Sequence, residues 1–306
     1  IDIGSNDGTI LEGFKARGMR VLGVEPTGIA KIANSRGIPT LQAFFSEDVA
    51  QGILKKEGPA SLITAANVFA HVANLGPCLR GIHALLGDRG TFISESHYLL
   101  DLIDTLQYDT IYHEHLRFYS IKPMQDMMKR FGFSVVDAER IPNHGGSIRV
   151  YAVKGTGNNP SGRLQELVKQ EESYGLYGSA LYATFAQRVR QSKWKLMHLL
   201  SDLKMKGHRI AGIGSPGRSS TVMNYCGIGP DYLDYTAEQA TSLKVGLFTP
   251  GTHVPVVDEK RLFEDQPEYA LVLAWHLGET IPRKLRSKGL RSKFIMPLPD
   301  PVILDW

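Results

Sequence analysis

The chain has 306 residues, of which 42 % are hydrophobic, and its 35 basic and 31 acidic residues give a formal net charge of +4. A single hydrophobic core rarely grows beyond about 250 to 300 residues, so two domains are expected. The charges are spread along the chain without the basic block that binding to a nucleic acid or an anionic membrane requires. A small anionic substrate remains compatible with this charge pattern.

The two cysteines, Cys78 and Cys226, lie far apart and outside any CxxC pair. The chain alone therefore cannot build a disulfide framework or a cysteine zinc site. No apolar run approaches the roughly 18 residues of a membrane span, and the N-terminus has no basic segment before an apolar run. We expect a soluble protein of the cytoplasm.

The first half of the chain alternates apolar, β-branched runs with helical patterns, which predicts a parallel sheet with crossover helices. Residues 1–4 are typical of the last part of a buried strand, so we interpret the chain as a fragment that lacks the start of this strand. Strands are expected at about 1–4, 20–25, 40–45, 61–68 and 90–95.

The pattern changes after residue 119. Ser120 followed by residues 121–131 predicts a capped helix, and the alternating runs 134–141 and 147–154 predict an antiparallel hairpin. Five parallel strands closed by a hairpin are typical of class I methyltransferases, whereas a nicotinamide-binding Rossmann domain usually continues with a sixth parallel strand. We therefore predict an α/β fold whose first domain, residues 1–155, is a Rossmann-like seven-strand sheet of the class I methyltransferase type.

Glycine, asparagine and proline residues at 155–160 indicate the end of that domain. Apolar residues at helical spacing follow, so we expect a helical connector over residues 156–206. Residues 207–306 then predict a second, smaller Rossmann-like α/β domain. Its expected elements are strands at 209–213, 269–275 and 293–297 and a helix at 219–225.

The loop after the first strand, residues 2–8, reads DIGSNDG. Its glycines let backbone amides approach a ligand, but it lacks a full GxGxxG and carries two carboxylates. Such carboxylates disfavour a pyrophosphate, whereas the ammonium and sulfonium groups of S-adenosylmethionine tolerate them, so this cofactor is favoured over NAD.

Glu25 ends the second predicted strand, where a carboxylate can bind both ribose hydroxyls, and Asn67 ends the fourth strand at the same edge of the sheet. The alternatives are a solvated acid and a turn-forming asparagine. The predicted cofactor contacts are Gly4, Asn6, Asp7, Gly8, Glu25, Pro26 and Asn67.

The segment Tyr112-His113-Glu114-His115 follows the fifth strand and its helix. A metal site at His113 and His115 is one interpretation, but no third ligand stands at a motif spacing. A general base fits better, because neutral imidazole titrates near neutrality and a neighbouring carboxylate or phenol can orient it. Histidines that only hydrogen-bond within a loop are the alternative. His71, four residues after Asn67, is expected at the same edge of the sheet.

Two further segments are candidate substrate contacts. The hairpin carries His144, Ser147 and Arg149, which either face a phosphate or form only a turn and a sheet-surface charge. In the second domain, residues 212–217 match GxGxxG between a strand and a helix, with Arg218 following. They predict a nucleotide-type site at Gly214 and Arg218, or a plain turn of the chain.

With these motifs the sequence resembles the sugar C-methyltransferases that act on nucleotide-linked 4-keto-deoxysugars, such as the 3-C-methyltransferases of antibiotic sugar pathways. The resemblance runs essentially from Ile1 to the C-terminus, and YHEH together with the second glycine loop makes it specific. Its motifs are IDIGSNDG (1–8), GVEPT (23–27), ANVFAHV (66–72), YHEHLRFYS (112–120), GGSIRVYA (145–152), GIGSPGRSSTVMNYCGIG (212–229) and PGTHVPV (250–256).

The resemblance implies an S-adenosylmethionine-dependent C-methyltransferase whose substrate is a nucleotide-linked sugar. From the residues alone, no metal site is expected. It implies that His115 is the base, with Tyr112 and Glu114 as active-site partners and His71 as a further active-site histidine. Family members also carry an N-terminal zinc-binding module that this chain lacks, and many have an Ala-Pro-Ala-Lys run where residues 215–218 are Ser-Pro-Gly-Arg. An NAD-dependent oxidoreductase and a non-catalytic cofactor-binding subunit remain the alternatives.

Overall fold

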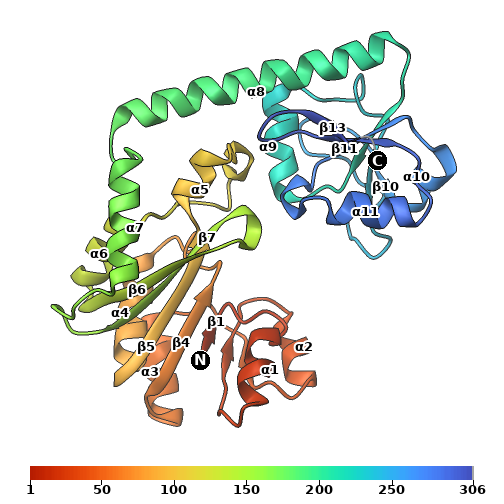
Figure 1. Ribbon diagram of the computed structural model, residues 1–306. Helices are drawn as coiled ribbons and strands as arrows, with labels where there is room; N and C mark the ends of the chain where they lie inside the picture. The colour runs from red at the N-terminus through yellow and green to blue at the C-terminus, as the bar shows by residue number, and fades with distance from the viewer. Residues whose placement is uncertain (305–306) are drawn as a thin grey trace. The chain divides into compact units, whose positions relative to one another are not determined.

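The computed structural model describes residues 1–304, which form two compact units. Unit 1 contains Ile1–Leu100 and Glu114–Tyr177, and unit 2 contains Asp101–His113 and the chain from Gly178 onward. Figure 1 labels many of the helices and strands of both units along the coloured chain.

Unit 1 is built on a seven-strand sheet. Its strands are β1 (Asp2–Ile3), β2 (Gly23–Val24), β3 (Thr40–Leu41), β4 (Ala60–Ala66), β5 (Leu86–His97), β6 (Phe133–Ile141) and β7 (Ser147–Lys154). They lie in the order β3-β2-β1-β4-β5-β7-β6. The first five are parallel, whereas β7 pairs antiparallel with both β5 and β6. The predicted class I methyltransferase sheet with its closing hairpin is confirmed.

Helices connect these strands and bury their apolar faces against the sheet. They are α1 (Thr9–Lys15), α2 (Ala30–Ser35), α3 (Glu47–Glu57), α4 (Leu75–Leu85), α6 (Ile121–Arg130) and α7 (Gly162–Ser173), with one 3₁₀ turn, η2 (Asn143–Gly145), in the hairpin. Leu79, Ile82 and Leu85 of α4 are completely buried, as are Ile63 of β4 and Phe92 of β5. Figure 1 shows α1 and α2 beside the β1 side of the sheet and α6 and α7 beside β6.

The start of α6 is held by a distant carboxylate. Ser120 occupies the predicted N-cap position, but its side chain accepts no capping hydrogen bond from the helix. Both carboxylate oxygens of Glu171, a fully buried residue of α7, accept from the amide of Ile121 at 2.7 and 3.0 Å, and the hydroxyl of Tyr177 donates to the same carboxylate. A negative charge is favourable at a helix N-terminus, so the Glu171 carboxylate stabilises the start of α6. The predicted helix is therefore present, but Glu171 caps it in place of Ser120.

Unit 2 contains the second, smaller Rossmann-like sheet that the sequence predicts. Its strands are β8 (Ile210–Ile213), β9 (Thr236–Glu238), β10 (Val256–Asp258), β11 (Tyr269–Val272), β12 (Lys293–Met296) and β13 (Val302–Leu304), in the order β10-β9-β8-β11-β12-β13. Only β13 is antiparallel to its neighbour among these described strands. Its helices are α8 (Ser179–Met205), α9 (Gly217–Cys226), α10 (Lys260–Asp265) and α11 (Thr280–Ser287), with 3₁₀ turns η1 (Tyr108–Thr110) and η3 (Trp275–Leu277).

The helices expected as a connector over residues 156–206 are divided between the two units. α7 belongs to unit 1, where Leu164 and Leu167 are buried. α8 belongs to unit 2, and its residues Leu196, Leu200 and Leu203 join that unit's core. The apolar spacing therefore predicted the helices, but it did not show which core each one joins, and the first domain ends later than residue 155.

The segment Asp101–His113 also departs from the predicted domain order, because it packs in unit 2. It contains the last part of α5 (Leu99–Asp104) and all of η1. The fully buried carboxylate of Asp109 accepts two hydrogen bonds of 2.7 Å from Arg218 and one of 2.7 Å from the indole of Trp275. No helix within the described chain is long and apolar enough to cross a membrane.

Candidate active site

The loop between β1 and α1 turns sharply at Gly4, which has a φ of +72°. Its amide donates to the carbonyl of Val24 at 2.8 Å, so the loop stays against the end of β2. A Cβ at this position would lie 2.5 Å from the side chain of Val68, and therefore only glycine fits. Further along the loop, Gly8 has a φ of +84° and is buried against Ile38.

Glu25 lies directly after β2 and is 6 % exposed. One carboxylate oxygen accepts from the amide and hydroxyl of Thr27, at 2.9 and 2.7 Å. The other accepts from the amide of Asn6 at 3.1 Å and keeps a lone pair for a further donor. Pro26 follows at the same corner. A ribose hydroxyl is a donor that fits this carboxylate.

Asp2 is a buried carboxylate of β1, just before the same loop. Its Oδ1 accepts from the hydroxyl of Thr64 at 2.6 Å, whereas Oδ2 has no hydrogen-bond partner among residues 1–304. Burial raises the pKa of Asp2 to about 6. An unsatisfied buried carboxylate oxygen stabilises a nearby cation, so the amino-acid part of S-adenosylmethionine fits the chemistry of this loop.

Two other predicted cofactor contacts have local roles. The carboxylate of Asp7 accepts from the amide and hydroxyl of Thr9, at 3.1 and 2.7 Å, and pairs with Arg36 at 2.7 Å. The hydrogen bonds from Thr9 lower the pKa of Asp7. Asn67 has a φ of +55° just after β4, and its amide donates to the carbonyl of Glu95 at 2.8 Å. Asp7 holds the start of α1, and Asn67 turns the chain at the carboxyl edge of the sheet.

Residues 114–117 are bound to the loop that follows β4. The amide of Leu116 donates to the carbonyl of Ala70 at 2.9 Å, and Nδ1 of His71 lies 2.9 Å from the carbonyl oxygen of Glu114. A carbonyl only accepts, so this nitrogen of His71 carries a proton. The guanidinium of Arg117 donates to two carbonyls of the same loop. These contacts fix the backbone on both sides of His115.

Four imidazoles follow one another at this edge. The ring centre of His115 lies 5.1 Å from that of His71 and 5.0 Å from that of His97, and the ring of His97 lies 6.0 Å from that of His144. His97 was not predicted, because the fifth strand was expected to end near residue 95. Had the strand been extended by two residues, His97 would have been recognised at the carboxyl end of a parallel strand, where ligands bind.

The hairpin tip that carries His144 is held by polar contacts. His144 has a φ of +56°, and Asn143 donates to Glu95 at 3.1 Å. Ser147 donates to the carbonyl of Asn143 at 3.1 Å. Glu95 also binds Arg149 at 2.9 Å, which connects the tip to the centre of the sheet.

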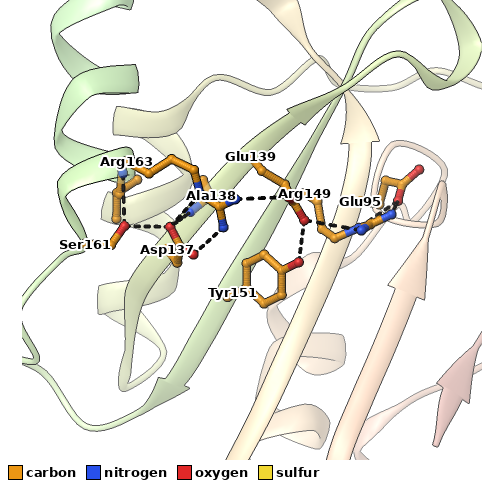
Figure 2. A network of polar contacts seen from close by, with 9 residues as sticks. Glu95, Asp137, Ala138, Glu139, Arg149, Tyr151, Ser161 and Arg163 are labelled. Carbon is orange, nitrogen blue, oxygen red and sulfur yellow. Dashed lines mark hydrogen bonds and ion pairs between the residues drawn. The ribbon is translucent and has the colours of Figure 1, made fainter.

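Figure 2 shows how this network continues across β5, β7 and β6. Arg149 pairs with Glu139 at 3.3 Å, and Arg163 at the start of α7 pairs with both Glu139 and Asp137. A hydrogen bond from Tyr151 is the main cause that lowers the pKa of Glu139. The guanidinium of Arg149, a predicted substrate contact, therefore lies between two carboxylates of its own sheet.

Tyr112 and Arg218 belong to unit 2, whereas Glu114 and His115 belong to unit 1. The ring of Tyr112 lies beside Gly217, where a Cβ would be 3.4 Å from the ring. Arg218 is buried with its guanidinium on Asp109. The structure thus groups His71 and His115, and it places Arg218 within the core of unit 2.

The second glycine loop has the same local geometry as the first. Gly214 has a φ of +79°, and its amide donates to the carbonyl of Ala237 at 2.8 Å. The amide of Ser215 donates to the carboxylate of Glu238 at 2.6 Å, as the amide of Asn6 does to Glu25. Glu238 ends β9 and was not among the predicted residues, although the rule that identified Glu25 applies to it. In the part of the chain that is described, no group of three His, Cys, Asp or Glu residues could hold a metal ion.

Comparisons with known proteins match both parts of the chain to methyltransferases. Residues 142–299 match the family model "C-methyltransferase C-terminal domain", and residues 1–138 match "Methyltransferase domain". The C-methyltransferase NovU of Streptomyces niveus is 32 % identical over 308 aligned positions, which span 100 % of this chain and 73 % of NovU. The chain belongs to the C-methyltransferase family.

The match to the methyltransferase domain and the glycine loop with Glu25 identify S-adenosylmethionine as the cofactor of this chain. Solved structures similar to the chain are the TehB-like S-adenosylmethionine-dependent methyltransferase of Corynebacterium glutamicum (19 % identity, TM-score 0.37, 50 % of this chain and 78 % of that one) and the CcbJ methyltransferase of Streptomyces caelestis (13 %, 0.39, 51 % and 82 %). The family match, together with the sheet order of unit 1, identifies the chain as a methyltransferase.

Proposed function

We propose that this C-methyltransferase transfers a methyl group to the carbon next to the ketone of a nucleotide-linked 4-keto-deoxysugar, by base-catalysed enolisation. The observation that carries the proposal is the fixed position of His115. The backbone on both sides of it is bound to the loop after β4, and its ring lies between two other imidazoles, at the same sheet edge as the glycine loop.

His115 is the proposed general base. A carbon next to a ketone becomes a nucleophile only when its proton is removed, and neutral imidazole accepts a proton near neutral pH. S-Adenosylmethionine supplies the electrophilic methyl group when it is bound. The chain must therefore hold the sugar carbon close to that methyl group and keep the enolate oxygen hydrogen-bonded until transfer.

Two side chains are the proposed hydrogen-bond donors to the enolate oxygen. His71 donates one ring proton to the carbonyl of Glu114, so its other nitrogen donates to an enolate only when the ring is cationic. Tyr112 is the second proposed donor, and the Glu114 carboxylate orients a ring or binds a sugar hydroxyl.

Unit 2 is the proposed binding domain for the nucleotide part of the substrate. The support is the glycine turn at Gly214 before α9 and the carboxylate of Glu238, which repeat the arrangement of Gly4 and Glu25. In unit 1, His144 and Ser147 on the hairpin are proposed sugar contacts. Both cysteines are buried free thiols, which suits the reducing cytoplasm that we propose as the protein's location.

The test is incubation of the protein with S-adenosylmethionine labelled with ¹³C in its methyl group and a series of nucleotide-linked 4-keto-deoxysugars. We expect a new carbon-bound methyl signal in the sugar, next to the ketone carbon. A methyl group on oxygen or nitrogen, or no transfer to any of these sugars while the cofactor still binds, would contradict the proposal. In thermal unfolding, S-adenosylmethionine should raise Tm and NAD should not.

A further inference from the structure

His97 is the member of the imidazole row that the proposed mechanism does not use. It is the last residue of β5, half-buried, and its backbone pairs with Ser147 of β7. Its ring lies between those of His115 and His144, at centre distances of 5.0 and 6.0 Å. His144 is exposed, so the row leads from the proposed base to solvent.

The proposed reaction requires a route for a proton. A methyl group with the charge of a methyl cation replaces a proton on carbon, so each turnover releases one proton. The base that takes this proton must lose it before the next cycle. A base covered by substrate cannot pass the proton directly to bulk water, and a neighbouring imidazole is the side chain best suited to accept it near neutral pH.

We propose that His97 is the proton acceptor behind His115 and passes the proton to His144, which releases it to water. This inference rests on the proposed function. The C–H bond of the sugar breaks, its electron pair becomes the enolate, and the proton binds His115. A proton leaves the other nitrogen of that ring for His97, whose far nitrogen delivers one to His144. Each imidazole returns to its neutral form, and one proton enters solvent.

The surroundings of His97 suit this role. Two imidazoles joined by one hydrogen bond of about 2.9 Å have ring centres roughly 5 Å apart, which is close to the distance between the rings of His115 and His97. The longer distance from His97 to His144 leaves room for one bridging water. Strand pairing fixes His97, while the bond from Asn143 to Glu95 holds the hairpin tip that carries His144. Glu95 is the nearest carboxylate along β5 and is paired with Arg149, and the imidazoles of His115 and His144 both neighbour the ring of His97.

The kinetic test compares His97→Gln with the wild-type protein, first in a single turnover with enzyme in excess and then at steady state. Loss of a relay should leave the first turnover within about twofold of wild type and lower steady-state kcat at least about tenfold. Added imidazole should restore kcat. At saturating substrate the exposed His144→Gln variant should also lose steady-state kcat and regain it with added imidazole, whereas His83→Gln, which removes an imidazole packed on Phe133, should change neither rate.

Unchanged steady-state kcat in His97→Gln would overturn the proposal. Equal losses in the first turnover and at steady state, without rescue by imidazole, would overturn it as well and would indicate a structural role. Titration of ¹⁵N-histidine signals in the protein without substrate gives an independent readout, because coupled imidazoles titrate together. His97→Gln should shift the midpoint of His115 by about half a pH unit or more, and His83→Gln should not. If the wild-type protein shows no methyl transfer but its imidazoles titrate together, the proposed function is wrong and the contact between the imidazoles stands. If the imidazoles titrate independently, the proton relay is wrong.

Discussion

Asp109 and Arg218 lie 109 residues apart in the sequence and form a buried ion pair in unit 2, with two hydrogen bonds of 2.7 Å. The same carboxylate accepts from Trp275, and the guanidinium lies over the ring of that tryptophan at 4.9 Å. Through this pair, a segment that follows the first five strands in sequence becomes part of the core of the second unit. Two nitrogens of Arg218 reach both carboxylate oxygens, whereas a lysine in its place would make a single contact.

Arg218→Met should destabilise unit 2 by about 3 to 5 kcal/mol, because it leaves the Asp109 carboxylate buried without its cation. Arg218→Lys should cost less, since one charge-assisted hydrogen bond is kept. Urea unfolding followed by tryptophan fluorescence measures the effect, and Arg283→Met, which removes an exposed pair with Glu279, is the control. A loss no larger than in that control would show that the pair does not hold the segment.

Glu25→Ala should weaken binding of S-adenosylmethionine by roughly 1.5 to 3 kcal/mol, the range for a hydrogen bond to a charged group. Glu238→Ala removes the corresponding carboxylate in unit 2 and should leave cofactor affinity unchanged. Isothermal titration calorimetry on both variants measures the affinity for S-adenosylmethionine and shows which of the two carboxylates binds it. Equal affinities in wild type and Glu25→Ala would remove Glu25 from the cofactor site.

Asp2 should make the stability of the cofactor-free protein fall as pH rises from about 4 to 6. Its folded-state pKa of about 6 lies above that of an unfolded aspartate, so the folded protein holds more protons in this window and the free energy of unfolding decreases with pH. The loss approaches roughly 3 kcal/mol above pH 6. Relative to wild type, Asp2→Asn should therefore gain stability between pH 4 and pH 7 in urea unfolding.

The control for this pH dependence is Asp7→Asn. The pKa of Asp7 is lowered by its hydrogen bonds to Thr9, so its stabilisation is present above the unfolded pKa and is lost as pH falls. This variant should lose stability relative to wild type at neutral pH. The same direction of change in both variants would contradict the assignment of a raised pKa to Asp2.

Glu171→Gln should destabilise unit 1 by about 1 to 3 kcal/mol, because the negative charge at the start of α6 is lost and a buried acceptor is replaced. Ser120→Ala should have a smaller effect, since the hydroxyl of Ser120 does not cap the helix. Thermal unfolding of the two variants compares the caps directly. A larger loss in Ser120→Ala than in Glu171→Gln would return the capping role to Ser120.

Local sequence patterns predicted those parts of the fold that depend on local contacts. The strands of unit 1 with the closing hairpin, and both glycine loops, were recognised, because alternation, helical spacing and glycines at tight turns act within a few residues. In unit 2, the short strands β9, β10 and β13 were not predicted. Glu171 as a cap and Asp109 as a partner of Arg218 were not, since each bond joins residues 50 or more apart and leaves no periodic signal.

The candidate site was predicted only in part, because short motifs reveal some of its residues and not the others. His71 and His115 were identified from short motifs, and the structure brings their rings within 5.1 Å. His97 was missed because the end of β5 was set two residues too early, and strand ends are the least certain part of any such prediction. Tyr112 was predicted as an active-site partner of His115, and the structure assigns its segment, Asp101–His113, to unit 2, which no feature of the sequence indicates.

The central claim is that His115 removes the proton from the sugar carbon. The measurement is solvent deuterium exchange at that carbon, with S-adenosylhomocysteine in place of the methyl donor, so that deprotonation is observed without transfer. His115→Ala should lose this exchange by about 10² to 10⁴ and lose methyl transfer with it, while its affinity for S-adenosylmethionine stays close to that of wild type. If His115→Ala keeps wild-type exchange and loses only methyl transfer, then His115 is not the base.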